Sequence, residues 1–350
     1  AATALDCGLE LALHVADDAD AQLAALTERL GAADARIDRV LVFHEAEPAT
    51  DRRWVELARR RLVQVAPDAL FAGGTNANFC ELNRFRPDGS AEDGIVYAVT
   101  PQIHAFDEQS LVENLAGQAE TVRTARAFGG GRPVVVSPVT LKPRFNSVAT
   151  SDEPEPAPGE LPPPVDPRQM SLFGAGWTVG SLKRLIESGV AGATHYETTG
   201  WRGVIAGDAP SPEPALFPSR PGMVFPVYHV FADLAECKDG QIVQSRSSDP
   251  HAVETLAVAR DGTLHLLAAN LTPEPRTVAL DCFADGPVAA RRLHAGNAAP
   301  AAFDPARYRA QGETLMCDGG LAVTLAPFEI IRLQAPLGNG ARIERTLGSN

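Results

Sequence analysis

The chain has 350 residues, 45% hydrophobic and 21% charged, which is typical of a globular protein with room for more than one core. Its formal net charge of −13 argues against nucleic-acid and anionic-membrane partners, because both prefer a basic face. No apolar run reaches the roughly 18 residues that a membrane span needs. The five cysteines and eight histidines show no metal-ligand spacing, so we expect no metal, no disulfide framework and a cytoplasmic location.

The first 200 residues alternate short β-rich runs with amphipathic stretches of helical period. This alternation predicts right-handed βαβ units and a parallel sheet. The expected strands are Leu9–Val15, Val40–Phe43, Leu70–Gly73, Ile95–Thr100, Pro133–Val139 and Gly192–Tyr196. The expected helices cover residues 18–33, 50–66, 107–129 and 177–189.

Two features favour an α/β fold of the (β/α)₈ barrel type over a doubly wound sheet. No Gly-rich phosphate fingerprint follows an early strand, and we expect no cofactor. Polar and ionisable residues follow almost every strand, as in a barrel whose site is built from its βα loops. Only six strands are expected, and the chain opens on one without an initiator Met or a signal peptide. We therefore expect two βα units to lie upstream of residue 1.

The pattern changes twice further along the chain. Residues 151–170 hold seven prolines and predict a long excursion from the loop after the fifth strand, either a cover for the barrel mouth or a segment without function. The run 221–236 is expected to form the last barrel helix, and short alternating strands follow it, with a hairpin turn at Asp261-Gly262. The expected domains are a barrel over 1–236, an all-β sandwich over 237–336 and a tail over 337–350.

Candidate catalytic carboxylates lie where expected strands end. Glu45 follows the second strand beside His44, and this position suits acid–base chemistry. Glu197 follows the sixth strand, and the neighbouring Tyr196 and Trp201 suit a platform for a sugar ring. The alternative for Glu45 is a solvated loop side chain or a neighbour of a helix N-cap.

The segment 71–85, FAGGTNANFCELNRF, concentrates small and polar residues after the third strand. Its amides suit sugar hydroxyls, and its arginine suits either the nearby glutamate or a ligand carboxylate. The alternative is a turn stabilised by its own Asx hydrogen bonds. We expect the segment to bind a small polyhydroxylated ligand at a barrel mouth. Its polar members are Asn76, Asn78, Glu81, Asn83 and Arg84.

Two more strand ends carry polar groups. Gln102 and His104 follow the fourth strand, where the histidine is either structural or catalytic. Lys142 and Arg144 follow the fifth strand and suit a carbonyl oxygen or an anion, with solvation as the alternative. No serine occupies a GxSxG elbow, and Cys80 has no partner nearby in the sequence, so covalent Ser or Cys catalysis is disfavoured.

The order of elements resembles the clan-A retaining glycosidases. The resemblance rests on a barrel glutamate, then FPVYHVFADLAE, then a sandwich that begins LAVARDGTLHLLAANLT and ends LAPFEIIRL. If the first strand here is the third of eight, Glu45 falls where that clan keeps its acid/base. The chain departs from the clan at His44, where the clan has Asn, and at Lys142, where it has the nucleophilic Glu. Retaining cleavage needs two carboxylates roughly 5 Å apart, so ordinary retaining hydrolysis is disfavoured.

The runs GGTNANFCELNR, TPQIHAFDE and HYETTGW resemble the D-apionate lactonase family. This resemblance implies a hydrolase with a glycosidase-like barrel and a β-sandwich tail, which opens D-apionolactone to D-apionate in apiose breakdown. One of the three glutamates would activate water, and His104, Lys142 or Arg144 would stabilise the oxyanion. The expected partner is thus a small sugar or sugar lactone. A glycosidase with an atypical carboxylate pair and a catalytically silent carbohydrate binder stay open as alternatives.

Overall fold

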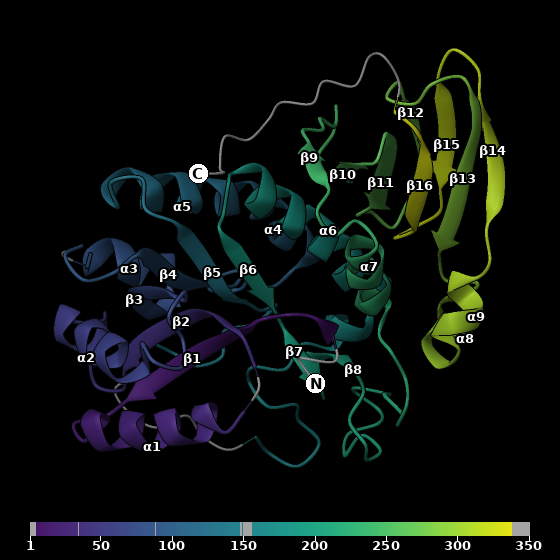
Figure 1. Ribbon diagram of the computed structural model, residues 1–350. Helices are drawn as coiled ribbons and strands as arrows, with labels where there is room; N and C mark the ends of the chain where they lie inside the picture. The colour runs from purple at the N-terminus through teal and green to yellow at the C-terminus, as the bar shows by residue number, and fades with distance from the viewer. Residues whose placement is uncertain (1–4, 34, 88, 148, 150–155, 338–350) are drawn as a thin grey trace. The chain divides into compact units, whose positions relative to one another are not determined.

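The computed structural model describes residues 5–337 except 34, 88, 148 and 150–155 (Figure 1). The first five residues of the predicted Pro-rich excursion, and the predicted tail beyond Leu337, lie outside the described residues. The contacts divide the chain into two compact units, and this division does not follow the predicted boundary at residue 236, which stays a prediction. The first unit comprises Ala1–Thr100, Glu120–Val139 and Val190–His195, and the second comprises Pro101–Ala119, Thr140–Gly189 and Tyr196–Asn350.

The first unit is built on one parallel sheet of six strands, in the order β1-β2-β3-β4-β5-β6. All six predicted strands are present among the described residues, and their pairing in chain order confirms the expected βαβ pattern. The strands are β1 Leu9–Val15, β2 Ile37–His44, β3 Leu70–Asn78, β4 Gly94–Val99, β5 Val134–Val139 and β6 Gly192–His195. The helices that start in this unit are α1 Ala19–Gly31, α2 Arg52–Leu62 and α3 Phe79–Arg84.

Successive side chains of a strand point to opposite faces of the sheet, and here both faces are covered by apolar residues. On β2, Val40 and Val42 pack in one apolar cluster with Leu23 of α1, and Figure 1 shows α1 and α2 along this side of β1 to β3. Leu41 and Phe43 lie in a separate cluster with residues of β3, β4 and β5. In a barrel, side chains on this face of the strands fill the interior, and the second cluster matches that expectation.

A polar network crosses the strands of the first unit. Glu10 on β1 accepts hydrogen bonds from Arg39 Nε at 2.7 Å, Ser137 Oγ at 2.7 Å and Thr194 Oγ1 at 2.6 Å. These partners come from β2, β5 and β6, so one carboxylate ties four strands together. A charge placed inside a protein is tolerated when it is paired and hydrogen-bonded in this way.

The segment after Gly73 forms regular structure where the sequence predicts a loop. β3 continues to Asn78, and α3 begins at the next residue. A Cβ atom at Gly74 would lie 2.0 Å from the carbonyl oxygen of Val96, so only glycine lets β3 approach β4 this closely. Thr75 is buried, and its Oγ1 donates to the carbonyl oxygen of Pro48 at 2.8 Å. The small and polar residues here therefore serve the packing of β3.

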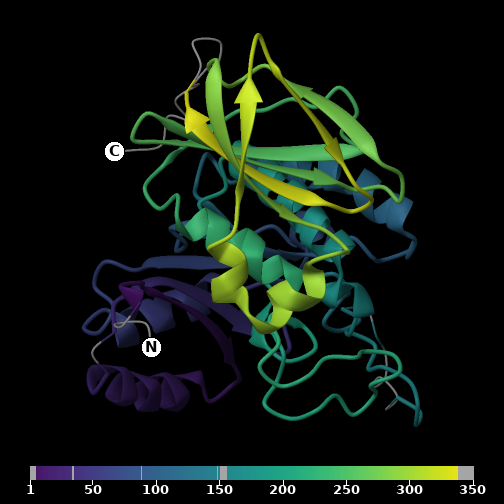
Figure 2. The ribbon, with the colours of Figure 1, turned by 90° about the vertical axis from the view of Figure 1, so that its right-hand side faces the viewer.

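The second unit contains the C-terminal β-sandwich (Figure 2). One sheet has the order β14-β13-β16-β11-β10-β9, and the other pairs β12 with β15. The predicted hairpin turn is confirmed, because Asp261 and Gly262 both have positive φ, 50° and 76°. The strands are β9 Gln241–Val243, β10 Val253–Arg260, β11 Thr263–Asn270, β12 Arg276–Leu280, β13 Gly286–Leu293, β14 Glu313–Cys317, β15 Leu321–Leu325 and β16 Ile330–Pro336.

Helices and short strands complete this unit. Figure 2 shows two of the helices, α8 and α9, as yellow-green turns at one end of the sandwich. None of the helices in the described part of the chain has the length and apolar character that crossing a bilayer requires. The remaining elements are α4 Glu108–Glu113, the start of α5 Leu115–Phe128, η2 Pro167–Met170, α6 Leu172–Glu187, β7 Glu197–Thr199, β8 Gly203–Ile205, α7 Pro226–Ala235, α8 Ala298–Phe303 and α9 Pro305–Arg309.

Two predicted helices have other bounds than expected. The helix predicted over 107–129 is broken at Asn114, whose side chain donates to the carbonyl oxygen of Pro101 at 3.0 Å. The helix predicted from residue 177 already begins at Leu172, because the Ser171 hydroxyl caps it by accepting the N–H of Gly174 at 3.0 Å. This start was not predicted, because two glycines in the first turns have low helix propensity and interrupt the apolar periodicity.

Candidate functional site

The end of β2 places its two predicted site residues differently. His44 is buried and stacks on Trp54 of α2, with ring centroids 4.5 Å apart. Its Nδ1 accepts the backbone N–H of Ala46 at 3.3 Å, so the ring helps to hold α2 against the sheet. Glu45 is exposed, and its backbone N–H donates to the carbonyl oxygen of Val15 at 3.0 Å. Only Glu45 of this pair presents a group to solvent.

The predicted ligand-binding segment after β3 divides between a strand and a short helix. Asn76 and Asn78 are half-buried on β3, and Asn78 starts α3. The Glu81 carboxylate lies 3.5 Å from Arg84 NH1 one turn along the same helix. Asn83 is exposed, and its Oδ1 accepts Arg86 NH2 at 2.6 Å. Glu81, Asn83 and Arg84 are thus engaged by neighbours on or beside α3.

A broad hollow of about 740 Å³ lies beside these elements in the first unit. Its size is within the range of small-molecule sites. No predicted site residue lines it, and its exposed Phe85 was not a candidate. The lining residues are Glu47, Pro48, Ala49, Thr50, Asp51, Arg52, Arg53, Glu56, Phe85, Arg86 and Pro87.

In the second unit, the loops that follow β5 and β6 share one small cavity. Its volume is about 10 Å³, which is room for roughly one water molecule. Three predicted site residues line it: Lys142 from the loop after β5, and Tyr196 and Trp201 from the segment after β6. The other lining residues are Thr140, Leu141, Pro164, Asp166, Gln169 and Arg202.

Cations outnumber free carboxylates around this cavity. Glu197 forms an ion pair with Arg202, and its side chain is 48% exposed. Burial lowers the pKa of Arg144 to about 10; the charge of Arg202 adds to this shift and that of Glu197 opposes it. With Lys142, which lines the cavity together with Arg202, this group contains three cations and one carboxylate. The Asp166 carboxylate does not change this balance, because it is already paired with a further arginine, Arg168, at 2.7 Å.

Arg202 and Asp166 were not among the predicted site residues. Arg202 directly follows the predicted platform residue Trp201, so its place in the sequence was a usable signal. Asp166 lies in the Pro-rich excursion, and nothing in the local pattern connects it with the loops after β5 and β6.

Two predicted substrate-binding residues are buried among protein partners. Gln102 is fully buried, and its Nε2 donates to the Leu141 carbonyl oxygen and to Asp166 Oδ2, both at 2.6 Å. Tyr196 is also buried, with its hydroxyl 2.8 Å from Thr178 Oγ1 on α6. Burial raises the pKa of this hydroxyl, so Tyr196 stays neutral. Both side chains support the loops through these bonds, and a role of either in binding a ligand stays a prediction. His104 is exposed in the loop before α4.

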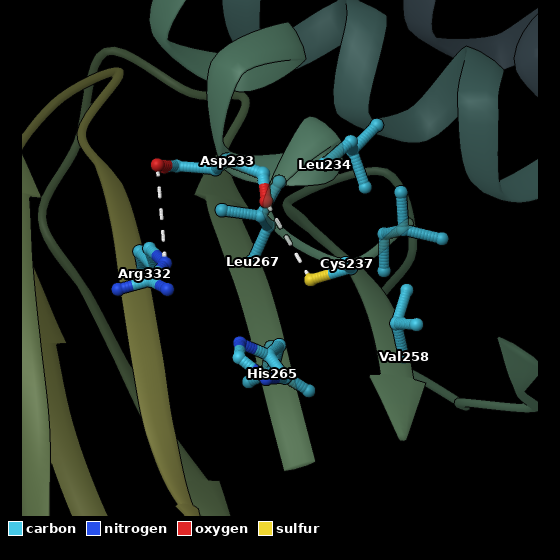
Figure 3. Close-up of a pocket in the computed structure, with 9 residues that line it drawn as sticks. Asp233, Leu234, Cys237, Val258, His265, Leu267 and Arg332 are labelled. Atoms are coloured by element: carbon cyan, nitrogen blue, oxygen red, sulfur yellow. Dashed lines mark hydrogen bonds and ion pairs between the residues drawn. The ribbon is translucent and has the colours of Figure 1, made fainter. Parts of the chain in front are cut away.

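A second enclosed cavity of about 10 Å³ lies between α7 and the sandwich strands β10, β11 and β16 (Figure 3). It brings Cys237, His265 and Asp233 to one lining, the residue types of a cysteine nucleophile with its base. Figure 3 shows the Cys237 thiol directed at the backbone oxygen of Asp233, to which Sγ donates at 3.5 Å. Burial raises the pKa of the Cys237 thiol and lowers that of His265. The thiol therefore stays protonated, and this cavity is no nucleophile site.

No group of three or more His, Cys, Asp or Glu side chains within the described residues is arranged to hold a metal ion. The arrangement after β5 and β6 instead offers an aromatic ring, one carboxylate and several cations. Such a set suits a neutral sugar derivative that acquires negative charge during its reaction.

Solved structures define the fold class. A 4-O-α-L-rhamnosyl-β-D-glucuronidase of Fusarium oxysporum is 14% identical, with a TM-score of 0.59 over 93% of this chain and 76% of its own. A family 51 α-L-arabinofuranosidase of Bifidobacterium longum is 12% identical, with a TM-score of 0.57 over 96% of this chain and 77% of its own. At such identities the likeness shows the fold alone. It confirms the predicted barrel of glycosidase type followed by a β-sandwich.

Sequence comparison identifies the family. Residues 1–239 match the family model described as D-apionate lactonase, TIM barrel domain, and residues 250–333 match its C-terminal immunoglobulin-like domain. The chain belongs to the D-apionate lactonase family, as its sequence motifs predicted. The D-apionate lactonase of Brucella anthropi is 26% identical over 289 residues, which are 79% of this chain and 45% of that protein. The chain thus spans less than half the length of this curated relative.

Proposed function

We propose that this chain hydrolyses a sugar lactone, D-apionolactone, to D-apionate in the breakdown of apiose. The observation that carries the proposal is the group of Lys142, Arg144 and Arg202 beside Glu197, in a member of the D-apionate lactonase family. Opening a lactone turns a neutral ester into an oxyanion and then into a carboxylate. A cationic site stabilises both of these negative charges.

The proposed reaction needs one base, one oxyanion site and one returned proton. Glu197 takes a proton from a water molecule while the water oxygen bonds to the lactone carbonyl carbon. Lys142 and Arg144 stabilise the oxyanion that forms on the carbonyl oxygen. The bond from this carbon to the ring oxygen then breaks, and the proton held by Glu197 passes to the departing ring oxygen. The product acid releases one proton to solvent at neutral pH, and Trp201 supports the sugar ring.

A retaining glycosidase is the alternative that the fold likeness suggests. Residues 140–147, directly after β5, contain no aspartate or glutamate, so no carboxylate lies where the glycosidase resemblance expects the nucleophile. An activated ester needs no such nucleophile, because a water molecule and a base are sufficient to open it. The lactonase proposal therefore fits these residues better. The proposed partner is a small sugar lactone, and a cytoplasmic location stays a prediction.

The test is proton release from a panel of sugar lactones that includes D-apionolactone, with aryl glycosides measured in parallel. We expect lactone opening above the spontaneous rate and no cleavage of the glycosides. Cleavage of glycosides without lactone opening would replace the proposal by a glycosidase. Binding of sugars without any turnover would leave a carbohydrate binder.

A further inference from the structure

The Pro-rich excursion ends in a buried polar network that the proposed reaction does not use. Asp166, Gln102 and Gln169 are 3%, 0% and 4% exposed. Asp166 accepts Gln102 Nε2 at 2.6 Å and two guanidinium nitrogens of Arg168 at 2.9 and 2.7 Å. Burial by itself would raise the pKa of Asp166, but the hydrogen bonds from Arg168 and Gln102 outweigh it and lower this pKa. The carboxylate is therefore a permanent anion at the centre of the network.

Two arms leave this centre toward the two loops that line the cavity. The first arm is Gln102, whose Nε2 also donates to the carbonyl oxygen of Leu141 at 2.6 Å, one residue before Lys142. The second arm is Gln169, whose Nε2 donates to the carbonyl oxygen of Gly203 at 2.9 Å, one residue after Arg202. Each arm thus holds the main chain directly beside a cation of the site.

The centre and its arms are joined through the excursion itself. Asp166 caps η2 by accepting the backbone N–H of Arg168 at 2.9 Å, and Gln169 lies on the same turn. The Arg168 guanidinium also binds the first arm, since its NH2 donates to Gln102 Oε1 at 2.9 Å. It also donates to the carbonyl oxygen of Phe106 at 2.9 Å. The network thereby joins four separate stretches of chain, two of which bond to the Asp166 carboxylate directly.

We propose that Asp166 is a positioning residue. Through Gln102 and Gln169 it fixes the positions of Lys142 and Arg202 in the site. This proposal rests on the proposed function of the same site. A displacement of about 1 Å is enough to cost roughly 10²-fold in rate when a catalytic group must meet a developing charge. Backbone hydrogen bonds from fully buried side chains are well suited to prevent such a displacement.

The test compares three Gln→Leu variants of the full chain. Gln102→Leu and Gln169→Leu each remove one arm, whereas Gln109→Leu removes only an exposed bond from Gln109 Nε2 to Glu113 Oε1, at 2.8 Å, and serves as control. Hydrogen exchange is measured over residues 140–147 and 197–205, and kcat and KM are measured with D-apionolactone. Asp166→Asn, which keeps the size of the side chain, is added in case a leucine variant does not fold.

We expect each arm to act on its own loop. Gln102→Leu should speed exchange about tenfold in 140–147, and Gln169→Leu in 197–205, because each loop loses the hydrogen bond that holds it. Both variants should lower kcat by about 10- to 100-fold while KM changes less than threefold. Asp166→Asn should affect both loops, and the control should affect neither.

The outcomes separate this proposal from the function on which it rests. Unchanged exchange in both loops would overturn the positioning role. Faster exchange with an unchanged kcat would also overturn it, because the network would then be a structural element only. A wild-type chain that opens no lactone would overturn the proposed function and with it any catalytic role of the network, while exchange would still show whether the arms hold the loops.

Discussion

The segment from Gly74 to Arg84 and the loops after β5 and β6 show how differently polar residues are used in this molecule. In the first segment, Thr75 donates to Pro48 and Glu81 is paired with Arg84. These bonds lie within neighbouring elements and serve local structure. After β5 and β6, residues far apart in sequence line one cavity, and positive charge is in excess there.

This difference shows that a dense run of polar letters is weaker evidence for a site than side chains that converge from several loops. The first region is dense in sequence, but its members are divided between the end of β3 and the short helix α3, where several bond to near neighbours. The second region is sparse in sequence, yet its members meet because parallel strands bring their C-terminal loops to one edge of a sheet. The predictions that follow test this contrast, beginning with the largest expected effect.

Removal of a cation should be costly in the second region and harmless in the first. We expect Lys142→Met to lower kcat/KM for lactone opening about 10²- to 10³-fold, the usual cost of losing one oxyanion-stabilising group. Arg84→Met is the matched control and should stay within threefold, because Arg84 is an exposed partner of Glu81. Initial rates of proton release measure both. Equal activity of Lys142→Met and the wild type would remove Lys142 from the mechanism.

The three candidate glutamates should separate in the same assay. Glu197→Gln should lower kcat by about 10²-fold, because an amide cannot take the proton from water. Glu81→Gln should have almost no effect, because Glu81 lies on α3 and is not part of the proposed site of Lys142, Arg144, Arg202 and Glu197. A large loss in Glu45→Gln together with a small loss in Glu197→Gln would transfer the role of base to Glu45.

The glycine at the start of the first region should matter for stability and not for chemistry. Gly74→Ala should lower the free energy of unfolding by about 1–3 kcal/mol, because the new Cβ meets the backbone oxygen of Val96. Gly117→Ala is the control: no atom lies within 4 Å of its Cβ position, and its place in α5 predicts a gain of roughly 0.5–1 kcal/mol. Urea unfolding measures both. Reduced turnover per folded molecule in Gly74→Ala would show that β3 has a catalytic role after all.

The second unit should also lose stability in acid. Burial lowers the pKa of His229 on α7 from 6.5 to about 4, while its ring bonds to the carbonyl oxygen of Ala301 at 3.2 Å. His229 therefore becomes protonated below about pH 6.5 in the unfolded chain, but only below about pH 4 in the folded chain. The free energy of unfolding is therefore not reduced by this residue above pH 6.5, and it decreases as the pH falls from 6.5 to 4. At pH 5 the decrease from His229 is about 2 kcal/mol.

The measurement is the pH dependence of urea unfolding between pH 7 and pH 5. The variant His229→Gln should flatten this dependence even if it lowers stability at every pH. The variant Gln109→Leu removes no titratable group and serves as control, so it should leave the dependence as in the wild type. An unchanged slope in His229→Gln would show that other groups cause the acid sensitivity.

Much of the fold followed from local patterns in the sequence. The six parallel strands were predicted from short β-rich runs that alternate with amphipathic helices, and the Asp261-Gly262 hairpin from its turn residues, because these signals arise within a few neighbouring residues. The edge strand β14 was not predicted, because its five residues ETLMC end in three consecutive apolar residues and show no alternation. The helix α3 was missed because it is short and rich in polar residues.

The sequence by itself determined the family, the order of strands and helices and the presence of Lys142, Arg144 and Glu197 at strand ends. Only the tertiary structure decided that Gln102 is buried beneath the loop after β5 and that Asp166 joins this loop to the one after β6. The physical reason is that these hydrogen bonds connect residues 34 to 66 positions apart in the chain. No periodicity or spacing specifies partners at such separations, because their meeting depends on how all the intervening elements pack.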